Sequence, residues 1–262
     1  MRKLLAANWK ENPKSEKAAL ELFKRTSRGF AGKNISIVIC PPFLFLEKIA
    51  DEFRRGRLGK NVLLGAQDIF WEEQGPYTSE IGPKMLKALG LRYVIVGHSE
   101  RRTWMHETDA MINKKIKLAL RDGLDVILCV GEPFAVRKKG VSAAAAFITA
   151  QLKKDLAGIS RSAYKKGSVT VAYEPIWAIG SGRAAKPDDI VAASAHIKRA
   201  LREKGFAKAL VLYGGSVTSK NVADFVQLDE IGGALIGGAS LKADEFRKMV
   251  SIVEKNTNKN NH

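Results

Sequence analysis

Side chains that can move or attract protons stand at the ends of three apolar segments. Asn8-Trp9-Lys10 follows the first segment, Gly97-His98-Ser99-Glu100 follows a later one, and Tyr173-Glu174-Pro175 follows a third. A carboxylate, an imidazole and an ammonium group together can remove a proton beside a carbonyl, polarise that carbonyl and stabilise the oxyanion that forms. Strand-like alternation would place Asn8 and Lys10 on the same side of the chain. These residues are therefore candidates for a catalytic set.

Each candidate also has a purely structural explanation. Lys10 could be a surface lysine at the end of a strand, and a lone histidine is more often structural than catalytic. Ser99-Glu100 can begin a short helix after His98. The positive end of a helix dipole disfavours the protonated imidazole, so His98 would stay neutral and could donate a hydrogen bond to a carbonyl. These residues alone leave both explanations open.

Two glycine-rich segments and one apolar segment favour a phosphorylated ligand. Gly214-Gly215-Ser216 and Gly237-Gly238-Ala239-Ser240 each follow an apolar run. Such glycines can be simple turns, but their unobstructed backbone N–H groups can also bind phosphate. The segment after Glu174 is apolar and ends in Gly180-Ser181-Gly182, which is typical of a lid, although it could also be a buried loop. Together these features predict proton abstraction beside the carbonyl of a small phosphorylated sugar.

The elements that would position these residues form a repeating pattern along 262 residues. Eight short apolar runs are separated by helical segments, and the runs are apolar throughout, as in strands covered on both faces. This predicts an α/β protein with a single (β/α)8 barrel over residues 1–255, followed by a disordered polar tail at 256–262. An open, doubly wound sheet is the alternative. In a barrel, the loops that follow the strands share one mouth. The runs begin near Leu4, Ile35, Val62, Tyr93, Val126, Val169, Leu210 and Ala234.

Bulk composition narrows the class of protein. A formal net charge of +17 is the unusual property, and we interpret it as a solvated surface that also attracts anionic substrates. Binding to nucleic acid or to a membrane is the alternative, and neither partner is expected. Cys40 and Cys129 are far apart, which predicts two reduced thiols and no metal site. The first apolar stretch is too short for a signal peptide, so a cytoplasmic location is expected.

Five motifs in order along the chain resemble the triosephosphate isomerase family. They cover the chain from end to end, and each follows an apolar run. The motifs are Asn8-Trp9-Lys10, Gly97-His98-Ser99-Glu100-Arg101-Arg102, Ala172-Tyr173-Glu174-Pro175-Ile176-Trp177-Ala178-Ile179-Gly180, Tyr213-Gly214-Gly215-Ser216 and Gly237-Gly238-Ala239-Ser240-Leu241.

The resemblance implies interconversion of dihydroxyacetone phosphate and D-glyceraldehyde 3-phosphate through an enediolate, with no metal and no cofactor. It implies that Glu174 is the base and that neutral His98 is the electrophile. Lys10 would stabilise the oxyanion, Asn8 would orient the same oxygens, and Glu100 would support Lys10. Phosphate would be bound by Gly180, Ser216, Gly237 and Gly238. The lid would comprise Pro175, Ile176, Trp177, Ala178, Ile179, Ser181 and Gly182, with Glu132 holding Trp177 while the lid is open.

The resemblance also implies a homodimer in which residues 67–82 of one copy enter a pocket of the other. Thr78 lies at the tip of this loop, and Ser79 stands where the family usually has glycine. If that position needs a positive φ, Ser79 adds strain of roughly 1 kcal/mol. Glu11 and Met105 also differ from the family near the expected interface. These departures concern the geometry of the expected interface.

Two other functions are alternatives to the isomerase. A Schiff-base aldolase could use Lys10, but it does not explain a glutamate followed by a lid. A basic barrel that binds nucleic acid would explain the charge, but the sequence shows no aromatic residues interleaved with basic ones. The isomerase explains all five motifs together.

Overall fold

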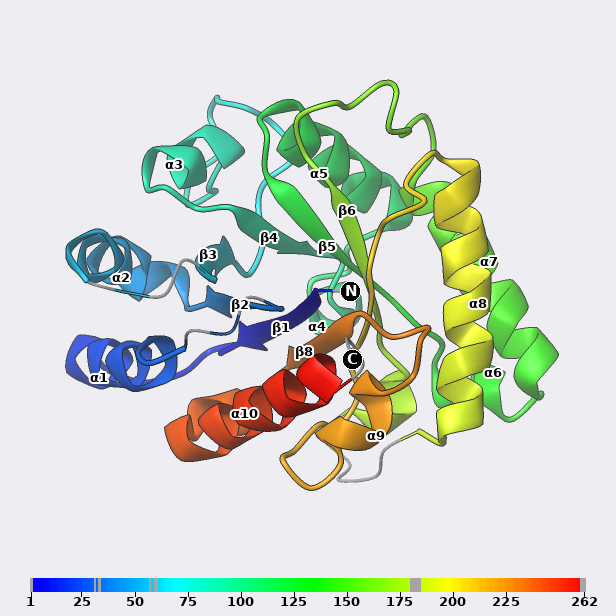
Figure 1. The fold of residues 1–262 in the computed structure, drawn as a ribbon. Coiled ribbons are helices and arrows are strands. Elements are labelled where there is room, and N and C mark those ends of the chain that lie inside the picture. Colours follow the sequence, from blue (N-terminus) through cyan, green and yellow to red (C-terminus); the bar gives the residue numbers. More distant parts are fainter. Residues whose placement is uncertain are drawn as a thin grey trace.

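Eight parallel strands form a closed barrel surrounded by helices (Figure 1). The computed structural model describes residues 2–30, 32, 34–56, 58, 61–179 and 185–259. The strands follow one another around the ring in sequence order, and β1 pairs with both β2 and β8. Leu4 is the partner of Ser36 on one side and of Gly233 on the other. The predicted (β/α)8 barrel is confirmed, and a closed ring excludes the open sheet.

The predicted strand starts agree with the structure to within one residue. The strands are β1 (Lys3–Asn8), β2 (Ile35–Cys40), β3 (Val62–Ala66), β4 (Tyr93–Val96), β5 (Asp125–Val130), β6 (Val169–Tyr173), β7 (Val211–Tyr213) and β8 (Gly233–Ile236). The α-helices are α1 (Glu16–Ser27), α2 (Phe43–Arg55), α3 (Pro83–Ala88), α4 (Ser99–Trp104), α5 (Asp109–Arg121), α6 (Phe134–Arg137), α7 (Val141–Asp155), α8 (Pro187–Glu203), α9 (Val222–Val226) and α10 (Ala243–Lys259). Two 3-10 helices are η1 (Ile176–Ala178) and η2 (Gly238–Leu241).

The strands are apolar on both faces because both faces are buried. Leu4 and Ala6 of β1 belong to a cluster inside the barrel, whereas Leu5 and Ala7 belong to the larger cluster between the strands and the helices. Every residue of β2 and of β5 is likewise buried. Burial of this kind stabilises the folded state by about 25 cal/mol for each Å² of apolar surface removed from water. The two clusters together hold the strand ends in place.

The alternation of side chains along a strand also decides which residues reach the mouth of the barrel. Leu4 and Ala6 point inward, and the next residue in that series is Asn8. On β6, Ala172 points inward, and the next residue in that series is Glu174. Because every second residue of a strand points inward, the polar side chains at the strand ends face the mouth of the barrel directly above the inner core.

Local signals explain where several helices begin. Ser15 caps α1 by accepting a hydrogen bond from the backbone N–H of Ala18, and Pro187 is the first residue of α8. Among the described residues, no helix is both long and apolar enough to cross a bilayer.

The C-terminal helix differs from the sequence prediction. It was expected to end at Lys255, but α10 continues to Lys259, so residues 256–259 are helical and do not belong to a polar tail. The hydroxyl of buried Thr257 donates to the carbonyl of Val253 at 2.5 Å, which satisfies its polar group inside the helix. Composition alone did not reveal this contact. Residues 260–262 lie outside the described residues.

Closure of the barrel between β8 and β1 depends on the small size of Gly233. Its φ is +149°, and an added Cβ would lie 1.8 Å from the carbonyl oxygen of Leu4. Gly233→Ala should therefore lower the free energy of unfolding by roughly 1–3 kcal/mol or more, measured by urea denaturation. Gly90→Ala is the matched control, because Gly90 has a φ of +84° but no atom within 4 Å of the added Cβ. If both variants lose the same free energy of unfolding, the collision with Leu4 is not the cause of the loss.

Candidate active site

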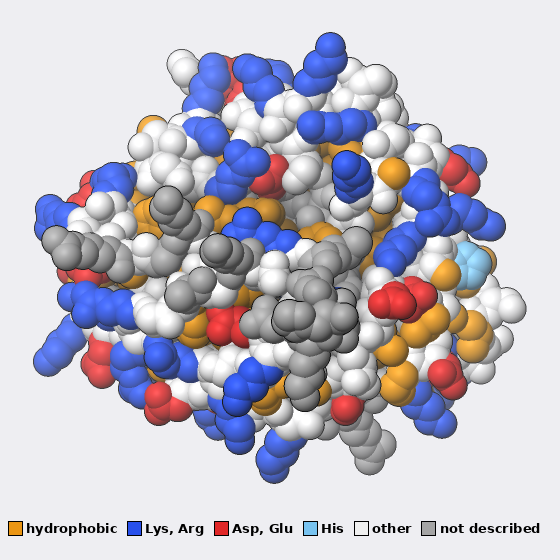
Figure 2. Space-filling view, in the orientation of Figure 1, with side chains coloured by type: hydrophobic (Ala, Val, Ile, Leu, Met, Phe, Trp, Pro, Cys, Tyr) orange, Lys and Arg blue, Asp and Glu red, His pale blue; other side chains and the backbone are white. Residues whose placement is uncertain are grey.

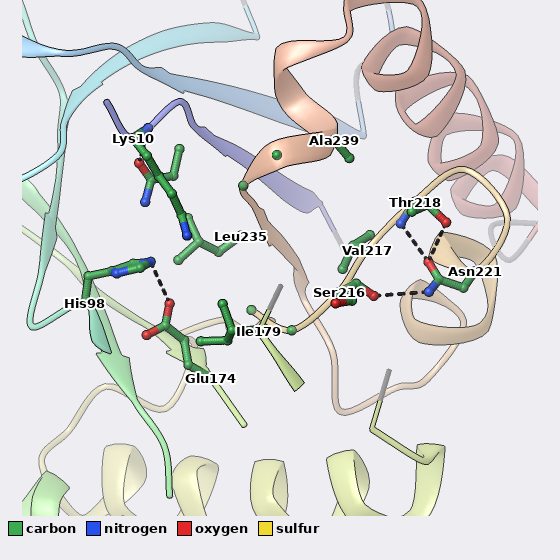
Figure 3. Close-up of a pocket in the computed structure, with 15 residues that line it drawn as sticks. Lys10, His98, Glu174, Ile179, Ser216, Val217, Thr218, Asn221, Leu235 and Ala239 are labelled. Atoms are coloured by element: carbon green, nitrogen blue, oxygen red, sulfur yellow. Dashed lines mark hydrogen bonds and ion pairs between the residues drawn. The ribbon is translucent and has the colours of Figure 1, made fainter. Parts of the chain in front are cut away.

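The polar residues at the strand ends line one cavity of about 310 Å³ (Figure 3). They come from elements far apart in the sequence, and their side chains face a common space. The structure thus brings together the predicted catalytic residues, the predicted phosphate-binding residues of the loops after β7 and β8, and one residue of the predicted lid. Those that line the cavity are Asn8, Lys10, His98, Glu174, Ile179, Ser216, Gly237 and Gly238.

Glu174 and His98 are in direct contact and almost completely buried. Nε2 of His98 lies 3.1 Å from Oε1 of Glu174 (Figure 3), and the backbone N–H of Ser99 donates to the other carboxylate oxygen at 3.0 Å. The Glu174 residue is only 2% exposed. The carboxylate is therefore held in place by two donors at the start of α4.

The tautomer of His98 follows from its other contact. The backbone N–H of Glu100 donates to Nδ1 of His98 at 3.2 Å, so this nitrogen presents a lone pair. The proton of the imidazole then lies on Nε2, which faces Glu174 and the cavity. His98 is also the N-cap residue of α4.

The backbone of Glu174 is fixed as firmly as its side chain. Its N–H donates to the carbonyl of Val130 at 2.7 Å, which continues the pairing of β5 with β6. A Cβ added at Gly131 would lie only 1.6 Å from the carbonyl oxygen of Glu174. A glycine is thus required beside Glu174, and Pro175 restricts the backbone on its other side.

Lys10 has a strained backbone that its neighbours maintain. Its φ is +54°, which is unusual for a residue with a side chain. The backbone N–H of Lys10 donates to Oδ1 of Asn8 at 3.1 Å, and Nε2 of Gln67 donates to the carbonyl of Lys10 at 2.9 Å. The ammonium group of Lys10 forms an ion pair with Glu100, as expected of a supporting carboxylate. These contacts direct Lys10 into the cavity.

The glycine segments after β7 and β8 form the opposite wall of the cavity. Gly238 begins the 3-10 helix η2, and the first N–H groups of such a helix have no partner within it. The loop after β7 is held by Asn221, whose side-chain amide donates to the carbonyl of Ser216 at 3.1 Å and accepts from the N–H of Thr218 at 2.8 Å (Figure 3). This wall can therefore present backbone donors to an anion.

The described part of the lid contacts residues on both sides of the cavity. Nε1 of Trp177 donates to Oε1 of Glu132 at 2.9 Å, which is the predicted contact. The hydroxyl of Ser216 donates to the carbonyl of Ala178 at 2.8 Å. Beyond the lid, the hydroxyl of Tyr213 accepts from the N–H of Ala185 at 2.9 Å. Ile176, Trp177 and Ala178 form η1, whereas Gly180, Ser181 and Gly182 lie outside the described residues.

Comparison with known proteins gives this site its context. A family model described as triosephosphate isomerase matches residues 3–253. A triosephosphate isomerase of Dictyoglomus turgidum is 43% identical over 255 residues, which cover 95% of this chain and 98% of that protein. This chain belongs to the triosephosphate isomerase family. The resemblance seen in the five motifs is thereby confirmed, and so is the predicted enzyme class, an isomerase.

Relatives in other organisms are similar over their whole length. A triosephosphate isomerase of Herpetosiphon aurantiacus is 44% identical over 260 residues, covering 95% of this chain and 98% of the relative. A triosephosphate isomerase of Caldanaerobacter subterraneus subsp. tengcongensis is 41% identical over 254 residues, covering 95% and 99%. The similarity thus includes all eight strands and the loops that form the cavity.

Arg102 supports the site from beneath, a role that the motif alone did not reveal. Its guanidinium donates to the carbonyl of Gly97, which follows β4, and to the carbonyl of Cys129 in β5. It also donates to the carboxylates of Asp109 in α5 and Asp155 in α7. One side chain therefore connects the end of β4, β5 and two helices next to His98. Its fork of five donors suits this task, which a lysine could not perform.

Several supporting residues were missed because their sequence signals were ambiguous. Gln67 follows β3 and reads as an ordinary loop residue, yet it donates to the carbonyls of Lys10 and Cys40. Asn221 precedes α9 and looks like a helix cap, but its side chain instead holds the loop after β7. Gln67 acts on segments distant in the sequence, which its local sequence could not indicate. Asn221 acts on Ser216 and Thr218 nearby, and the local sequence does not distinguish this role from that of a helix cap.

The cysteines and the acidic residues do not form a metal site in the described structure. Cys40 and Cys129 are free and buried, as predicted, and burial raises the pKa of both thiols. Among the residues that the structure describes, no group of three or more His, Cys, Asp or Glu side chains could hold a metal ion. Thr78 is exposed on the loop after β3 and does not line the cavity.

The carboxyl of Asp155 should make stability depend on pH. Burial raises its pKa from 3.8 to about 7, against the opposing effect of Arg102. Because the folded-state pKa is the higher one, the contribution of this group is fully present below about pH 4 and is lost as pH rises through 7, by up to about 4 kcal/mol. The expected result is that Asp155→Asn flattens the pH dependence of the free energy of unfolding over this range. Glu203→Gln, at an exposed position, is the control and should leave the pH dependence unchanged. If Asp155→Asn has the same pH dependence of the free energy of unfolding as the wild type, the assignment to Asp155 is wrong.

Proposed function

We propose that this protein interconverts dihydroxyacetone phosphate and D-glyceraldehyde 3-phosphate. The observation that carries the proposal is the contact between Glu174 and His98 in a cavity that also holds Lys10 and two glycine-rich loops. A base, a neutral hydrogen-bond donor, a cation and an anion-binding wall meet there. This is the set of groups that proton transfer between adjacent carbons of a small phosphorylated sugar requires.

Glu174 is the proposed base. Its carboxylate takes a proton from the carbon that bears the hydroxyl group of dihydroxyacetone phosphate, and the electrons of that C–H bond form the double bond of an enediolate. The same carboxylate, now protonated, returns a proton to the neighbouring carbon, which gives the aldehyde. No atom is gained or lost. The rigid backbone of Glu174, held between Gly131 and Pro175, limits the space over which its carboxylate must move.

His98 is the proposed electrophile. Its Nε2–H points to the cavity and can donate a hydrogen bond to the carbonyl oxygen, because Nδ1 is occupied by the N–H of Glu100. As charge builds up on the two oxygens of the enediolate, the imidazole can pass a proton between them. General acid–base contributions of this kind are worth about 10²–10⁴-fold each.

Lys10 and Asn8 are proposed to stabilise the oxyanion. The ammonium group of Lys10 enters the cavity from the side opposite Glu174 (Figure 3), and Glu100 holds it there. Asn8 orients the same oxygens and fixes the backbone of Lys10. A cation already in position needs no reorganisation during the reaction, which is the usual source of the largest catalytic effect.

The loops after β7 and β8 are proposed to bind the phosphate. Ser216, Gly237 and Gly238 line the cavity, and Gly180 completes the expected set from the lid, outside the described residues. Backbone donors at η2 lie beside the cavity wall. Binding energy from this remote, unreactive group can then position the three carbons against Glu174.

Residues 175–182 are proposed to close over the substrate. In the structure Trp177 contacts Glu132, a contact that closure would break, while Ser216 already contacts Ala178. Closure would exclude water from the enediolate and prevent loss of its phosphate group. The apolar residues Ile176 and Ile179 would form the inner surface of the lid.

A homodimer is also proposed, and surface features support it. Beside the active site lies a second cavity of about 540 Å³, which Lys10, Gln67 and Glu100 share with Trp104 and Met105. Trp104 is 73% exposed and Met105 is 61% exposed, which is unusual for such large apolar side chains. The exposed loop around Thr78 is the segment proposed to enter this cavity from a second copy.

Glu174→Asp tests the base, because it keeps the charge but withdraws the carboxylate by one methylene. We expect kcat to fall at least about 100-fold while KM changes little, since the phosphate wall is untouched. The measurement is a coupled isomerase assay with purified protein. Glu203→Asp makes the same change at an exposed site on α8 and should leave kcat unaltered. Near-normal turnover of Glu174→Asp would refute the mechanism.

Ser79→Gly tests the predicted strain in the dimer loop. Ser79 has a φ of +74°, so the suspected positive φ is present, and glycine should raise the free energy of unfolding by about 1 kcal/mol. The variant should also dimerise more tightly in sedimentation experiments. Ser251→Gly, at an exposed position of α10, is the control and should instead lower the free energy of unfolding by about 0.5 kcal/mol. A loss in both variants would show that Ser79 carries no strain.

A further inference from the structure

Positive charge is concentrated on the face of the barrel opposite the active site. The segments that lead into β1, β2, β3, β4, β6 and β7 contain Lys or Arg and no Asp or Glu. Only the segments before β5 and β8 contain acids. The long loop after β3, residues 67–82, has the reverse composition, with acids and no Lys or Arg. Figure 2 views the face where the strands begin, and Lys and Arg side chains surround its centre.

Part of this charge has a structural explanation. The last turns of α1, α2, α5, α7 and α8 contain Lys or Arg, which offset the negative ends of the helix dipoles on this face. Other cations lie outside those turns. Arg2 and Lys3 are at the start of β1, whereas Arg161 and Lys208 are in loops. Helix stability does not account for these four.

The four cations line two adjoining hollows. One has a volume of about 450 Å³ and includes Arg2 and Lys3, and the other has a volume of about 520 Å³ and includes Arg161 and Lys208. Tyr93 and Leu210 line both hollows, so together they form one groove across the floor of the barrel. We call it the floor groove.

The floor groove has almost no negative charge of its own. Its acidic residue is Asp125, whose carboxylate is occupied by Arg92 at 2.5 Å and by the N–H and hydroxyl of Ser168. Among the described residues, no ion pair joins Arg2, Arg161 or Lys208 to a carboxylate. The positive charge along the groove is therefore available to a ligand.

Several of these cations are held in position by the protein. Nη1 of Arg161 donates to the carbonyls of Gly167 at 2.5 Å and Tyr164 at 3.2 Å, and the ammonium group of Lys3 donates to the carbonyl of Ile231 at 2.6 Å. A guanidinium has five N–H donors and an ammonium has three, so donors remain for an anion. Fixed side chains lose less entropy when a ligand binds.

The surroundings of the groove indicate which polyanion it fits. A membrane surface is disfavoured because the large exposed apolar side chains, such as Leu44 and Trp104, belong to elements other than the groove. Stacking of nucleobases is disfavoured because Phe206 is buried and Tyr93 is only partly exposed. What remains is a flexible chain of anions without aromatic groups, small enough to lie in hollows of this size.

We propose that the floor groove binds a linear chain of phosphate groups. The phosphate oxygens accept hydrogen bonds from Arg2, Arg161, Lys3 and Lys208, and the hydroxyls of Ser36 and Ser168 line the same surface. The site lies at the opposite end of the barrel from the triose site. Occupancy of the groove therefore leaves the isomerase site accessible, and the positive charge acquires a role separate from attraction of the substrate.

The test is binding of inorganic polyphosphate with chains of about 15 phosphates, measured by calorimetry between about 50 and 200 mM salt. Arg161→Ala with Lys208→Ala in one variant should weaken binding about tenfold. Lys114→Ala with Lys248→Ala removes the same charge from exposed positions on α5 and α10 and should weaken it less than about twofold. The isomerase KM should not change at saturating polyphosphate.

Four outcomes would overturn the proposal. Equal weakening in the two double variants would show that only net charge matters. A rise in KM that is the same in wild type and groove variant would place the polyphosphate in the triose site. Tighter binding of a single-stranded or duplex RNA, or of an acidic peptide of equal charge, would assign the groove to that class of partner. Absence of binding at the lower salt concentration would leave the face without this function.

Discussion

The closed parallel barrel imposes one constraint on which the rest of the molecule depends: alternate residues of every strand must point into a sealed interior. Leu4, Ala6 and Ala172 satisfy this constraint in the core. At the strand ends the same alternation continues beyond the core, so that Asn8 and Glu174 face inward where the barrel opens. The position of the polar residues is therefore a consequence of apolar packing. A shift of one residue in either strand would turn these side chains toward the helices.

Close backbone contacts convert this approximate placement into a defined geometry. Gly131 allows the chain at Glu174 to approach β5, and Gln67 with Asn8 maintains the unusual φ of Lys10. The N–H of Glu100 sets the tautomer of His98. The contacts at Glu174 and Lys10 reduce stability, because one requires a glycine and the other a residue with a strained backbone. The proposed chemistry depends on groups that are already oriented before a substrate arrives.

The strands of the barrel could be predicted from the sequence, but the side-chain contacts between distant segments could not. Continuous apolar runs predicted strand starts within one residue, since burial on both faces leaves a strong signal. The chemical types of Glu174, His98 and Lys10 allowed either a catalytic or a structural explanation, and only their combination with the glycine-rich segments and the five motifs favoured a catalytic set. The roles of Arg102 and Gln67 depend on partners that only the fold brings near. The end of α10 was predicted wrongly because composition does not reveal the hydrogen bond of Thr257.

The most direct test of the central claim is isomerisation in D₂O. Purified wild-type protein is incubated with dihydroxyacetone phosphate, and deuterium at the carbon-bound positions of both triose phosphates is followed by NMR. A proton that passes through the carboxylate of Glu174 can exchange with solvent, so we predict deuterium in the product at the carbon that receives it. Isomerisation with no deuterium at any carbon would indicate direct hydride transfer and would contradict the account. Absence of isomerisation would contradict it as well.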